Sequence, residues 1–502
     1  MASDWWKVAR AGWRVSSAAN RSAHNGAASI LNNRLSRGAK QGILGPGDPP
    51  PPPHALQAGL WDYRGVARPR DIPPVSADFP LGRYIEPRRW SPGQRFWLSA
   101  PIANEHTIAL GPTRSGKTAS VIAPWIHHAL GLGYSVLAVD VKGKDELLNE
   151  VKRYSAYHGP LGVPVLKWDY ADPARSVSWD WIADLRDDGE VNAAVEAVCG
   201  RPSPSDPNKF FHQSAIKYLR GLLQLAPTMR APLTLEGMIA LLGDQRALES
   251  LVNARRGHPG STRLAELTGL SPGEFLKYTM ELKTHLEALD TSGFHAVTRS
   301  RQFSFDGLWN SRRAVLMIVN APVADGALAD AACSLFLGQF IQRALSGFGR
   351  ASSPILLVLD EGARVQRRLE LGTTLSLVAG AGISVLLATQ DVTQFDDDCR
   401  DEILANCGTM ICLPRVSRAT TDYLAGRLGE MQFASMTRST SQDRRVGGSQ
   451  SWTHSSERAA VLGHREIAAP PREFGGWPAI VHSPSVTSKP IVVDLTRLDL
   501  VP

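Results

Sequence analysis

Residues 111–118 read Gly-Pro-Thr-Arg-Ser-Gly-Lys-Thr and match GxxxxGK(S/T), the pattern of a phosphate-binding P-loop (Walker A). An apolar run, residues 106–110, enters this stretch, and residues 119–123 leave it with helical spacing. This strand–loop–helix context separates a working loop from a chance match, such as a glycine-rich turn that binds no nucleotide. The stretch therefore predicts a nucleotide site around which the rest of the chain can be placed.

The chemistry of phosphate binding gives each position of the loop a role. Gly111 and Gly116 let the backbone fold around an anion without a clashing Cβ, and the following helix N-terminus directs its amides at the phosphates. Lys117 is then the cation for the β- and γ-phosphates of ATP, and Thr118 offers its hydroxyl to Mg²⁺. We expect the nucleotide to contact the whole segment: Gly111, Pro112, Thr113, Arg114, Ser115, Gly116, Lys117, Thr118 and Ala119.

Composition sets broad limits on the class of protein. The 502 residues have room for two or three domains, and 43% hydrophobic with 21% charged residues is an ordinary globular balance. The formal net charge of +7 favours a polyanionic partner such as nucleic acid or anionic lipid. The five cysteines form no CxxC pair and indicate buried thiols in a reducing cytoplasm. Because no apolar run is long enough for a membrane-spanning helix, we expect a soluble chain.

Most of the positive charge lies near the N-terminus. Residues 1–46 hold seven basic residues against one acidic residue, a net charge of +6. If residues 4–15 are helical, Trp5, Trp6 and Trp13 share one side and basic residues another, as in a helix that lies on an anionic membrane. The alternatives are a disordered basic arm, or a helix whose tryptophans dock on this protein's own core. A proline run, residues 49–53, then acts as an extended spacer.

Short β-branched runs alternate with helical patterns through much of the chain, which predicts an α/β fold with a parallel sheet covered on both faces. The predicted strands are residues 106–110, 135–140, 163–168, 314–319, 354–360, 383–388 and 409–413. Residues 185–300 lack strand signals and have helical patterns broken by Pro and Gly, which indicates an inserted all-α domain. The polar residues 435–460 are typical of a flexible connector, and the last forty residues predict a strand-bearing extension.

These patterns predict five segments. They are a basic, Pro-rich N-terminal tail at residues 1–59, the first part of a P-loop ATPase domain at 60–184, and the all-α insertion at 185–305. The second part of the ATPase domain follows at 306–432, and the connector and C-terminal extension at 433–502.

Two further strand ends carry candidate catalytic residues. Asp360 and Glu361 close the most apolar strand, where Asp360 can hold the Mg²⁺ shell opposite Thr118 and Glu361 can polarise the attacking water. A buried strand that ends in Asp-Glu can instead provide the N-cap of the next helix. Gln390, at the tip of the neighbouring strand, is placed to sense the γ-phosphate, or is an ordinary polar residue at a strand end.

Five motifs together resemble a known family. They are Gly111 to Thr118 with Val121-Ile122-Ala123-Pro124, Asp140-Val141-Lys142-Gly143, Leu359-Asp360-Glu361, Ala388-Thr389-Gln390-Asp391 and Ala405-Asn406-Cys407-Gly408-Thr409. In this order they resemble the coupling proteins of type IV secretion and conjugation, the TraG/TraD-type ATPases that are relatives of the FtsK and HerA motors. The resemblance covers roughly residues 80–495.

The resemblance implies a RecA-like motor domain and an all-α domain that meets the relaxosome or a secreted substrate. It also implies a homo-hexamer around a central channel, and ATP-driven movement of single-stranded DNA, with its relaxase, or of protein toward the secretion channel. The expected catalytic residues are then Lys117, Glu361 and Gln390. The expected Mg²⁺ ligands are Thr118 and, through water, Asp360. We expect a cytoplasmic protein, peripheral at the bacterial inner membrane through residues 1–46.

The chain departs from the family pattern in three places. Family members usually carry N-terminal transmembrane helices, whereas this chain has only the Trp/Arg tail. Lys144 replaces the usual acidic residue after Lys-Gly, and residues 380–382 read Gly-Ala-Gly where relatives often have an arginine. An arginine that acts across a subunit boundary must therefore come from elsewhere, the candidates being Arg364, Arg367, Arg368 and Arg415.

Two alternative functions fit the same motifs. A DNA translocase for partition or packaging would share the motor and differ in its partners. A nucleotide-gated adaptor would use ATP binding to order the hexamer with negligible turnover, which the missing arginine favours.

Overall fold

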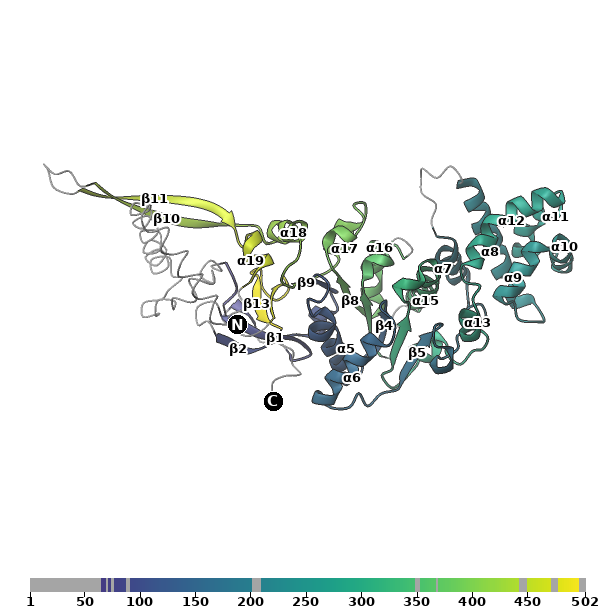
Figure 1. The fold of residues 1–502 in the computed structure, drawn as a ribbon, viewed down its shortest axis with the longest axis horizontal. Helices are drawn as coiled ribbons and strands as arrows, with labels where there is room; N and C mark the ends of the chain where they lie inside the picture. Colours follow the sequence, from purple (N-terminus) through teal and green to yellow (C-terminus); the bar gives the residue numbers. More distant parts are fainter. Residues whose placement is uncertain are drawn as a thin grey trace, which may run out of the picture.

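The protein is elongated, with the P-loop domain in the middle, a group of helices at one end and a long hairpin at the other (Figure 1). The structure, a computed structural model, describes residues 65–68, 71–73, 76–86, 91–200, 209–347, 353–366, 369–441, 449–470 and 477–495. The predicted N-terminal helix and the proline spacer lie outside these residues, so the expectations for the tail remain predictions.

The centre of the molecule is an 11-stranded sheet in which seven neighbouring strands are parallel. In spatial order these are β9 (Thr409–Cys412), β3 (Thr107–Leu110), β8 (Ile383–Thr389), β7 (Ile355–Asp360), β4 (Ser135–Asp140), β6 (Leu316–Asn320) and β5 (Val165–Asp169). Each of them was predicted from an apolar run. The α/β fold class and the parallel sheet are therefore confirmed.

Helices cover both faces of the inner parallel strands, and alternate residues of these strands enter two different cores, whereas the edge strand β5 contributes Leu166 and Trp168 to one core only. In β7, Leu356 and Val358 pack with α5 (Ala123–Gly131) and α6 (Glu146–His158). Leu357 and Leu359 pack on the opposite side, with α7 (Asp188–Cys199), α15 (Ala327–Ser346) and α16 (Leu371–Val378). Because both faces are buried, the strand sequences are continuously apolar rather than alternating.

Four antiparallel strands extend the sheet beyond β9. They follow in the order β12 (Pro478–His482), β13 (Ile491–Asp494), β1 (Phe79–Glu86) and β2 (Ser91–Leu98). The short helix α4 (Ala100–Ala103) connects β2 to β3. The expected strands near the C-terminus are thus present, and they pair with a segment that precedes the P-loop.

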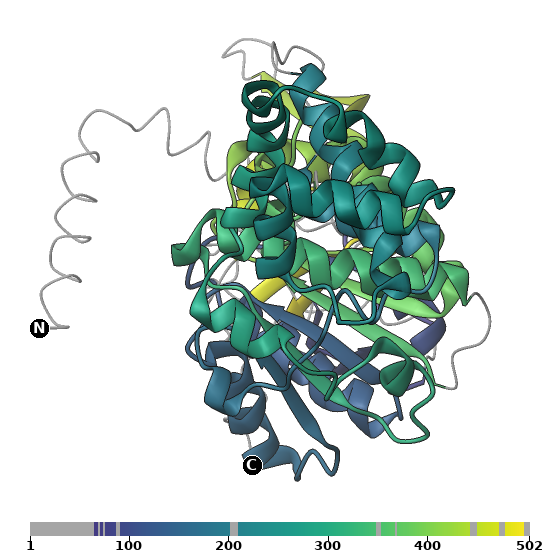
Figure 2. The same cartoon turned by 90° about the vertical axis from the view of Figure 1, so that its right-hand side faces the viewer.

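No strand occurs between β5 and β6 among the described residues, as the helical prediction expected. The helices there are α7, α8 (Lys209–Leu225), α9 (Leu235–Gly243), α10 (Gln245–Ala254), α11 (Pro259–Thr268), α12 (Pro272–Glu287), α13 (Ser292–Thr298) and α14 (Phe305–Trp309). Helix α7 packs on α15 of the sheet layer as well as on α8. Figure 2 views the molecule from this end, where the helices from α8 to α12 lie farthest from the sheet.

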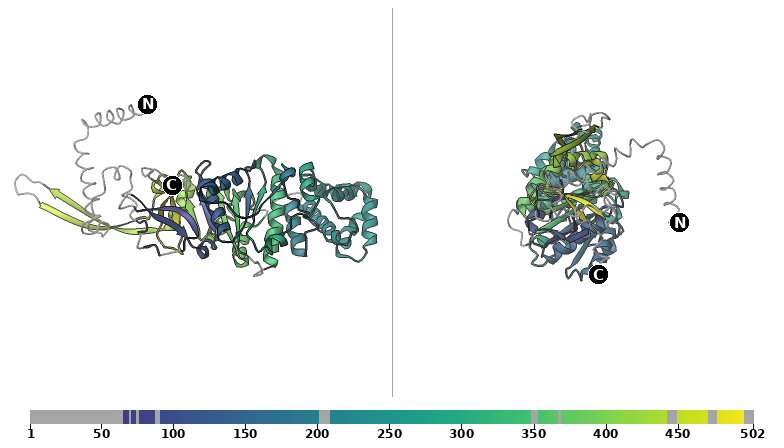
Figure 3. Two further views of the ribbon diagram at one scale, coloured as in Figure 1. Left: turned by 90° about the horizontal axis from the view of Figure 1, so that it is seen from below. Right: turned by 90° about the vertical axis from the view of Figure 1, so that its left-hand side faces the viewer.

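The prediction of a flexible connector at residues 435–460 is wrong. The described residues of this segment, 435–441 and 449–460, belong to a regular hairpin of β10 (Glu430–Ser441) and β11 (Ser449–Ala460), paired from Glu430 with Ala460 to Ser441 with Ser449. The hairpin projects away from the sheet (Figures 1 and 3). The pairing of such a ribbon rests on main-chain hydrogen bonds, which leave no signal in composition.

Of the remaining helices, α18 (Arg418–Leu428) and α19 (His464–Ala468) pack together beside the base of the hairpin, and α17 (Arg400–Ala405) packs on α16. In the part of the chain that the structure describes, no helix has both the length and the apolar character that crossing a bilayer requires.

Candidate nucleotide-binding site

Three parallel strand ends meet at one edge of the sheet. Strand β8 lies between β3, which enters the P-loop, and β7, which ends at Asp360. Leu110 of β3 is in register with Thr389, and Asp360 with Ala388. Because parallel strands present their carboxyl ends at the same edge, the P-loop, Gln390 and the Asp360-Glu361 pair become neighbours.

The P-loop backbone adopts the conformations that an anion-binding loop requires. Arg114 (φ 61°) and Gly116 (φ 92°) have left-handed backbones, which turn successive amides toward one side. A Cβ atom on Gly111 would lie 2.6 Å from the Ser115 hydroxyl, so only glycine fits there. The following helix begins as a π-helical turn, η3 (Thr118–Ile122), before α5.

Lys117 is buried inside the loop. Its Nζ donates to the carbonyl oxygen of Gly111 and lies 3.5 Å from that of Pro112. Burial lowers the pKa of this ammonium group, while the negative charges of Glu361 and Asp360 oppose that shift. The cation is therefore held next to both carboxylates of the distant β7 strand end.

Thr118 and Asp360 lie side by side, as expected for a pair that holds Mg²⁺. The Thr118 hydroxyl donates to Asp360 Oδ2 at 3.3 Å. Burial raises the pKa of Asp360, and Lys142 and Lys117 partly offset this effect. A buried carboxylate beside a hydroxyl supplies the oxygen ligands that magnesium prefers.

Glu361 and Gln390 are linked to each other and to the loop. Glu361 has a left-handed backbone (φ 71°, ψ 51°) and its side chain makes no capping bond to the turn that follows, so the alternative role as an N-cap is not what the geometry shows. Gln390 Nε2 donates to Glu361 Oε1 at 3.2 Å, and the Thr113 hydroxyl donates to Gln390 Oε1 at 3.1 Å. Gln390 thereby bridges the P-loop and the carboxylate.

Lys142 also reaches the site, although the sequence motif that contains it, Asp140 to Gly143, predicted no role for this residue. Lys142 Nζ lies 2.9 Å from Glu146 Oε1, 3.5 Å from the Thr118 hydroxyl and 4.0 Å from Asp360 Oδ2. Burial lowers the pKa of Lys142, but the bond to Glu146 and the charge of Asp360 outweigh burial and raise it. Asp140, at the end of β4, accepts backbone bonds from Lys142 at 3.0 Å and Gly143 at 3.1 Å and so shapes this turn. The position of Lys142 just after a central strand was the signal that could have identified it.

These residues surround a cavity of about 450 Å³. Its wall includes residues 112–119, Asp360, Glu361 and Gln390, which is every predicted site residue except Gly111. Gly111 is linked to the wall through its carbonyl, which accepts the bond from Lys117. The rest of the wall comes from Val141, Lys142, Glu146 and Glu150.

The candidate arginines are not part of this wall where they are described. Arg364 pairs with Asp330 at 2.7 Å, and Arg415 is exposed with a left-handed backbone (φ 69°). Arg367 and Arg368 lie outside the described residues. The arginine that does line the cavity is Arg114, of the P-loop itself.

Solved structures of a conjugative coupling protein resemble this fold. The unbound form of TrwBΔN70, a bacterial conjugative coupling protein, has a TM-score of 0.61 and 14% sequence identity, covering 89% of this chain and 94% of that chain. TrwB with the non-hydrolysable GTP analogue GDPNP has a TM-score of 0.60 and 16% identity, covering 81% and 89%. TrwB with ADP and Mg²⁺ has a TM-score of 0.58 and 16% identity, covering 79% and 86%. No curated protein matches the sequence.

Two family models match separate parts of the sequence. Residues 81–253 match the model described as "Type IV secretory system Conjugative DNA transfer". Residues 354–472 match the model described as "TraM recognition site of TraD and TraG". Together the two matches cover more than half of the chain and include both the P-loop and the Asp360-Glu361 strand end. This chain belongs to the family of coupling proteins of conjugative type IV secretion.

Proposed function

We propose that this coupling protein binds ATP with Mg²⁺ in the cavity and hydrolyses it to drive DNA toward a secretion channel. The observation that carries the proposal is the convergence of Lys117, Thr118, Asp360, Glu361 and Gln390 on one cavity from three strand ends. In the P-loop NTPases, these residue types position the triphosphate, its metal ion and the attacking water.

The residues of the cavity fit a magnesium nucleotide. The Ser115 hydroxyl is buried within the loop and has no hydrogen-bond partner among the described residues, as expected for a group that serves a ligand. The cavity volume of about 450 Å³ lies within the range of small-molecule sites. TrwB, which shares the fold, has been solved with ADP and Mg²⁺ and with a non-hydrolysable ATP analogue.

Each residue then has a defined task. Lys117 exchanges its bond to the Gly111 carbonyl for the β- and γ-phosphate oxygens, and the P-loop amides hold the remaining charge. Thr118 and Asp360 would hold a magnesium ion, which would supply positive charge beside the phosphates when bound. Glu361 accepts a proton from the attacking water, while Gln390 keeps this carboxylate oriented toward the loop.

The partners follow from the family and the charge. We infer that the cargo is DNA, in single-stranded form with its relaxase, held through its backbone by a basic protein that assembles as a homo-hexamer. We further infer that residues 1–46 attach the protein to the cytoplasmic face of the inner membrane. We also infer that the chain is divided into the five predicted segments, and that the all-α insertion is the part that contacts the cargo complex.

The test is the rate of ATP hydrolysis with and without single-stranded DNA. Lys117→Ala and Glu361→Gln should each reduce the rate by about 10²-fold or more, since a positioned catalytic group contributes several kcal/mol. Lys152→Ala and Glu249→Gln, exposed residues of α6 and α10, are the matched controls and should retain the rate. Unchanged hydrolysis in both site variants would remove the catalytic assignment.

A second candidate is a nucleotide-gated adaptor with negligible turnover. It is favoured by residues 380–382, which read Gly-Ala-Gly where relatives often have an arginine, because without an arginine that reaches the γ-phosphate from a neighbouring subunit turnover is slow. Oligomerisation that requires ATP without any hydrolysis, even with DNA and vesicles present, would support the adaptor. Co-purification with a relaxase or a channel ATPase would distinguish a coupling protein from a translocase for partition or packaging, because such a translocase needs neither partner.

A further inference from the structure

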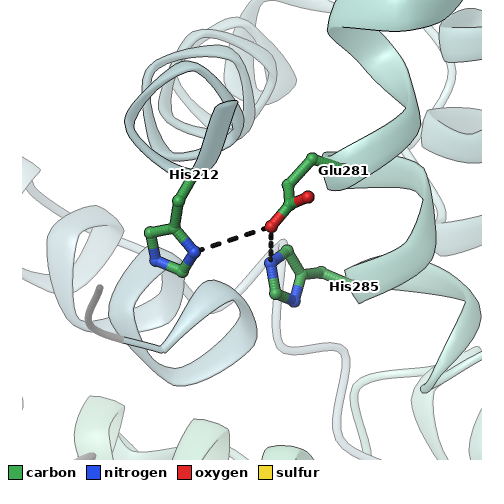
Figure 4. Close-up of side chains that lie close together, drawn as sticks. All are labelled: His212, Glu281 and His285. Carbon is green, nitrogen blue, oxygen red and sulfur yellow. Dashed lines mark ion pairs between the residues drawn. The ribbon is translucent and has the colours of Figure 1, made fainter. Parts of the chain in front are cut away.

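Away from the nucleotide cavity, three side chains of types that can ligate a metal ion meet between two helices at the far end of the molecule. His212 lies in the first turn of α8, and Glu281 and His285 lie one turn apart in α12 (Figure 4). Residues four apart share a helix face, so both α12 side chains reach toward α8. The donor atoms of all three residues lie within 4.8 Å of one another.

The hydrogen bond of His212 fixes what its other nitrogen can do. Nε2 lies 3.1 Å from the carbonyl oxygen of Gly200, at the end of α7. A carbonyl oxygen only accepts, so Nε2 carries the hydrogen and Nδ1 of the neutral ring presents a lone pair. That lone pair faces Glu281 Oε1, a second acceptor, at 3.8 Å. Two acceptors that face each other repel, and a proton or a metal ion between them relieves this repulsion.

The distances distinguish a proton from a metal ion. A protonated imidazole would donate to a carboxylate at about 2.7–2.9 Å. Glu281 Oε1 instead lies 3.8 Å from His212 Nδ1 and 3.6 Å from His285 Nε2. Around a tetrahedral zinc ion, with bonds of about 2.0–2.1 Å, neighbouring donors lie about 3.3 Å apart. Small side-chain rotations would bring all three donors to that separation.

We propose that His212, Glu281 and His285 form a binding site for Zn²⁺ or a closely related first-row divalent ion, with water as the fourth ligand. Two imidazoles and one carboxylate suit such ions and not Ca²⁺ or Mg²⁺, which prefer oxygen ligands throughout. The Gly200 carbonyl supplies the outer hydrogen bond that zinc-binding histidines characteristically make through their second nitrogen.

Such an ion would join three helices of the insertion. It links α8 directly to α12, and the bond from His212 to Gly200 extends the link to the end of α7. Because α7 packs on α15 of the sheet layer, the ion would fix the start of α8 relative to the motor. The site therefore has a structural role, independent of the nucleotide cavity.

The test uses the untagged full-length chain, freed of metal and titrated with Zn²⁺ and with Co²⁺, whose visible absorption reports its geometry. We expect one equivalent of bound ion that disappears in His285→Gln and in Glu281→Gln. Glu287→Gln, an exposed substitution in the same helix, is the matched control and should keep that equivalent. Hydrogen exchange in α8 and α12 should slow on addition of Zn²⁺ in the wild type and not in His285→Gln.

A second set of closely spaced donors, Asp396, Asp398 and Cys399, provides a comparison. Asp398→Asn should not change the one equivalent of Zn²⁺ that binds between α8 and α12. Retained ATP hydrolysis and helical circular dichroism would show that the variants are folded. The proposal fails if the wild type binds no Zn²⁺, or if binding and exchange rates are the same in wild type, His285→Gln and Glu281→Gln.

Discussion

The parallel strands from β9 to β5 and the antiparallel strands β12, β13, β1 and β2 belong to one sheet, yet only the parallel half carries the nucleotide cavity. Parallel strands deliver all their carboxyl ends to one edge, so short loops from β3, β8 and β7 can place charged groups around one ligand. Antiparallel strands alternate their ends, and neighbouring loops point in opposite directions. The antiparallel half instead supports the helix that follows the P-loop, through Trp125 and His128 of α5.

The largest effect is expected from removing the contact through which the antiparallel strand β1 supports α5. Trp125 is fully buried, packs on Phe79 of β1 with ring centroids 4.8 Å apart, and donates from Nε1 to the Pro80 carbonyl at 2.9 Å. Trp125→Ala should lower the free energy of unfolding by about 3–5 kcal/mol, because it leaves a large cavity and an unpaired carbonyl. Denaturant unfolding measures this, with Trp125→Phe expected to lose distinctly less. Equal losses in both variants would show that burial of the indole does not join the halves.

Acid should weaken the same junction. The ring of His128, in α5, lies 5.3 Å from the ring of Trp97 in β2. Burial, and to a smaller extent the charge of His127, lowers the pKa of His128 to about 4 from an unfolded value of 6.5. The unfolded chain then binds the proton first, so this contribution to stability is full above pH 6.5 and is lost as the pH falls toward 4. Between pH 7 and pH 4.5, wild type should lose up to about 3 kcal/mol more than His128→Gln. Parallel pH profiles for the two proteins would contradict the burial of a neutral ring.

A change confined to the parallel half should affect chemistry and not stability. Gln390 makes its bonds to Thr113 and Glu361 at the edge of the cavity, outside both cores. Gln390→Ala should reduce kcat about tenfold, equivalent to about 1.4 kcal/mol, with little change in KM or in the unfolding free energy. Steady-state kinetics beside denaturant unfolding tests this. If kcat is unchanged, Gln390 is an ordinary polar residue at a strand end.

The smallest effect is expected from the hairpin beyond the antiparallel half. Thr437 pairs with Thr453 in the middle of β10 and β11, and proline is disfavoured inside a paired strand because it has no N–H to donate. Thr437→Pro should leave ATP hydrolysis and the stability of the body within about 0.5 kcal/mol of wild type. Loss of hydrolysis in the isolated protein would mean that the hairpin is coupled to the cavity.

The sequence predicted the parallel half far better than the antiparallel half, for physical reasons. Strands buried on both faces are continuously apolar, so β3, β4, β7 and β8 were visible one by one, and the residues at their ends followed. The pairing of β1 with β13 joins segments at opposite ends of the chain, and no local pattern encodes such a partner. The sequence did not show that Lys142 lies at the nucleotide site, because its contacts to Thr118 and Glu146 depend on how the turn after β4 folds. Likewise, His212 and His285 come together only through helix packing.

Nucleotide binding in this cavity is tested most directly by a crystal structure of the full chain with Mg²⁺ and a non-hydrolysable ATP analogue. We expect Lys117 Nζ to leave the Gly111 carbonyl and to contact the γ-phosphate at about 3 Å, with the ion held by Thr118 and Asp360 and with Glu361 facing the γ-phosphate. A nucleotide bound elsewhere, or triphosphate density that Asp360 and Glu361 do not approach, would contradict this expectation.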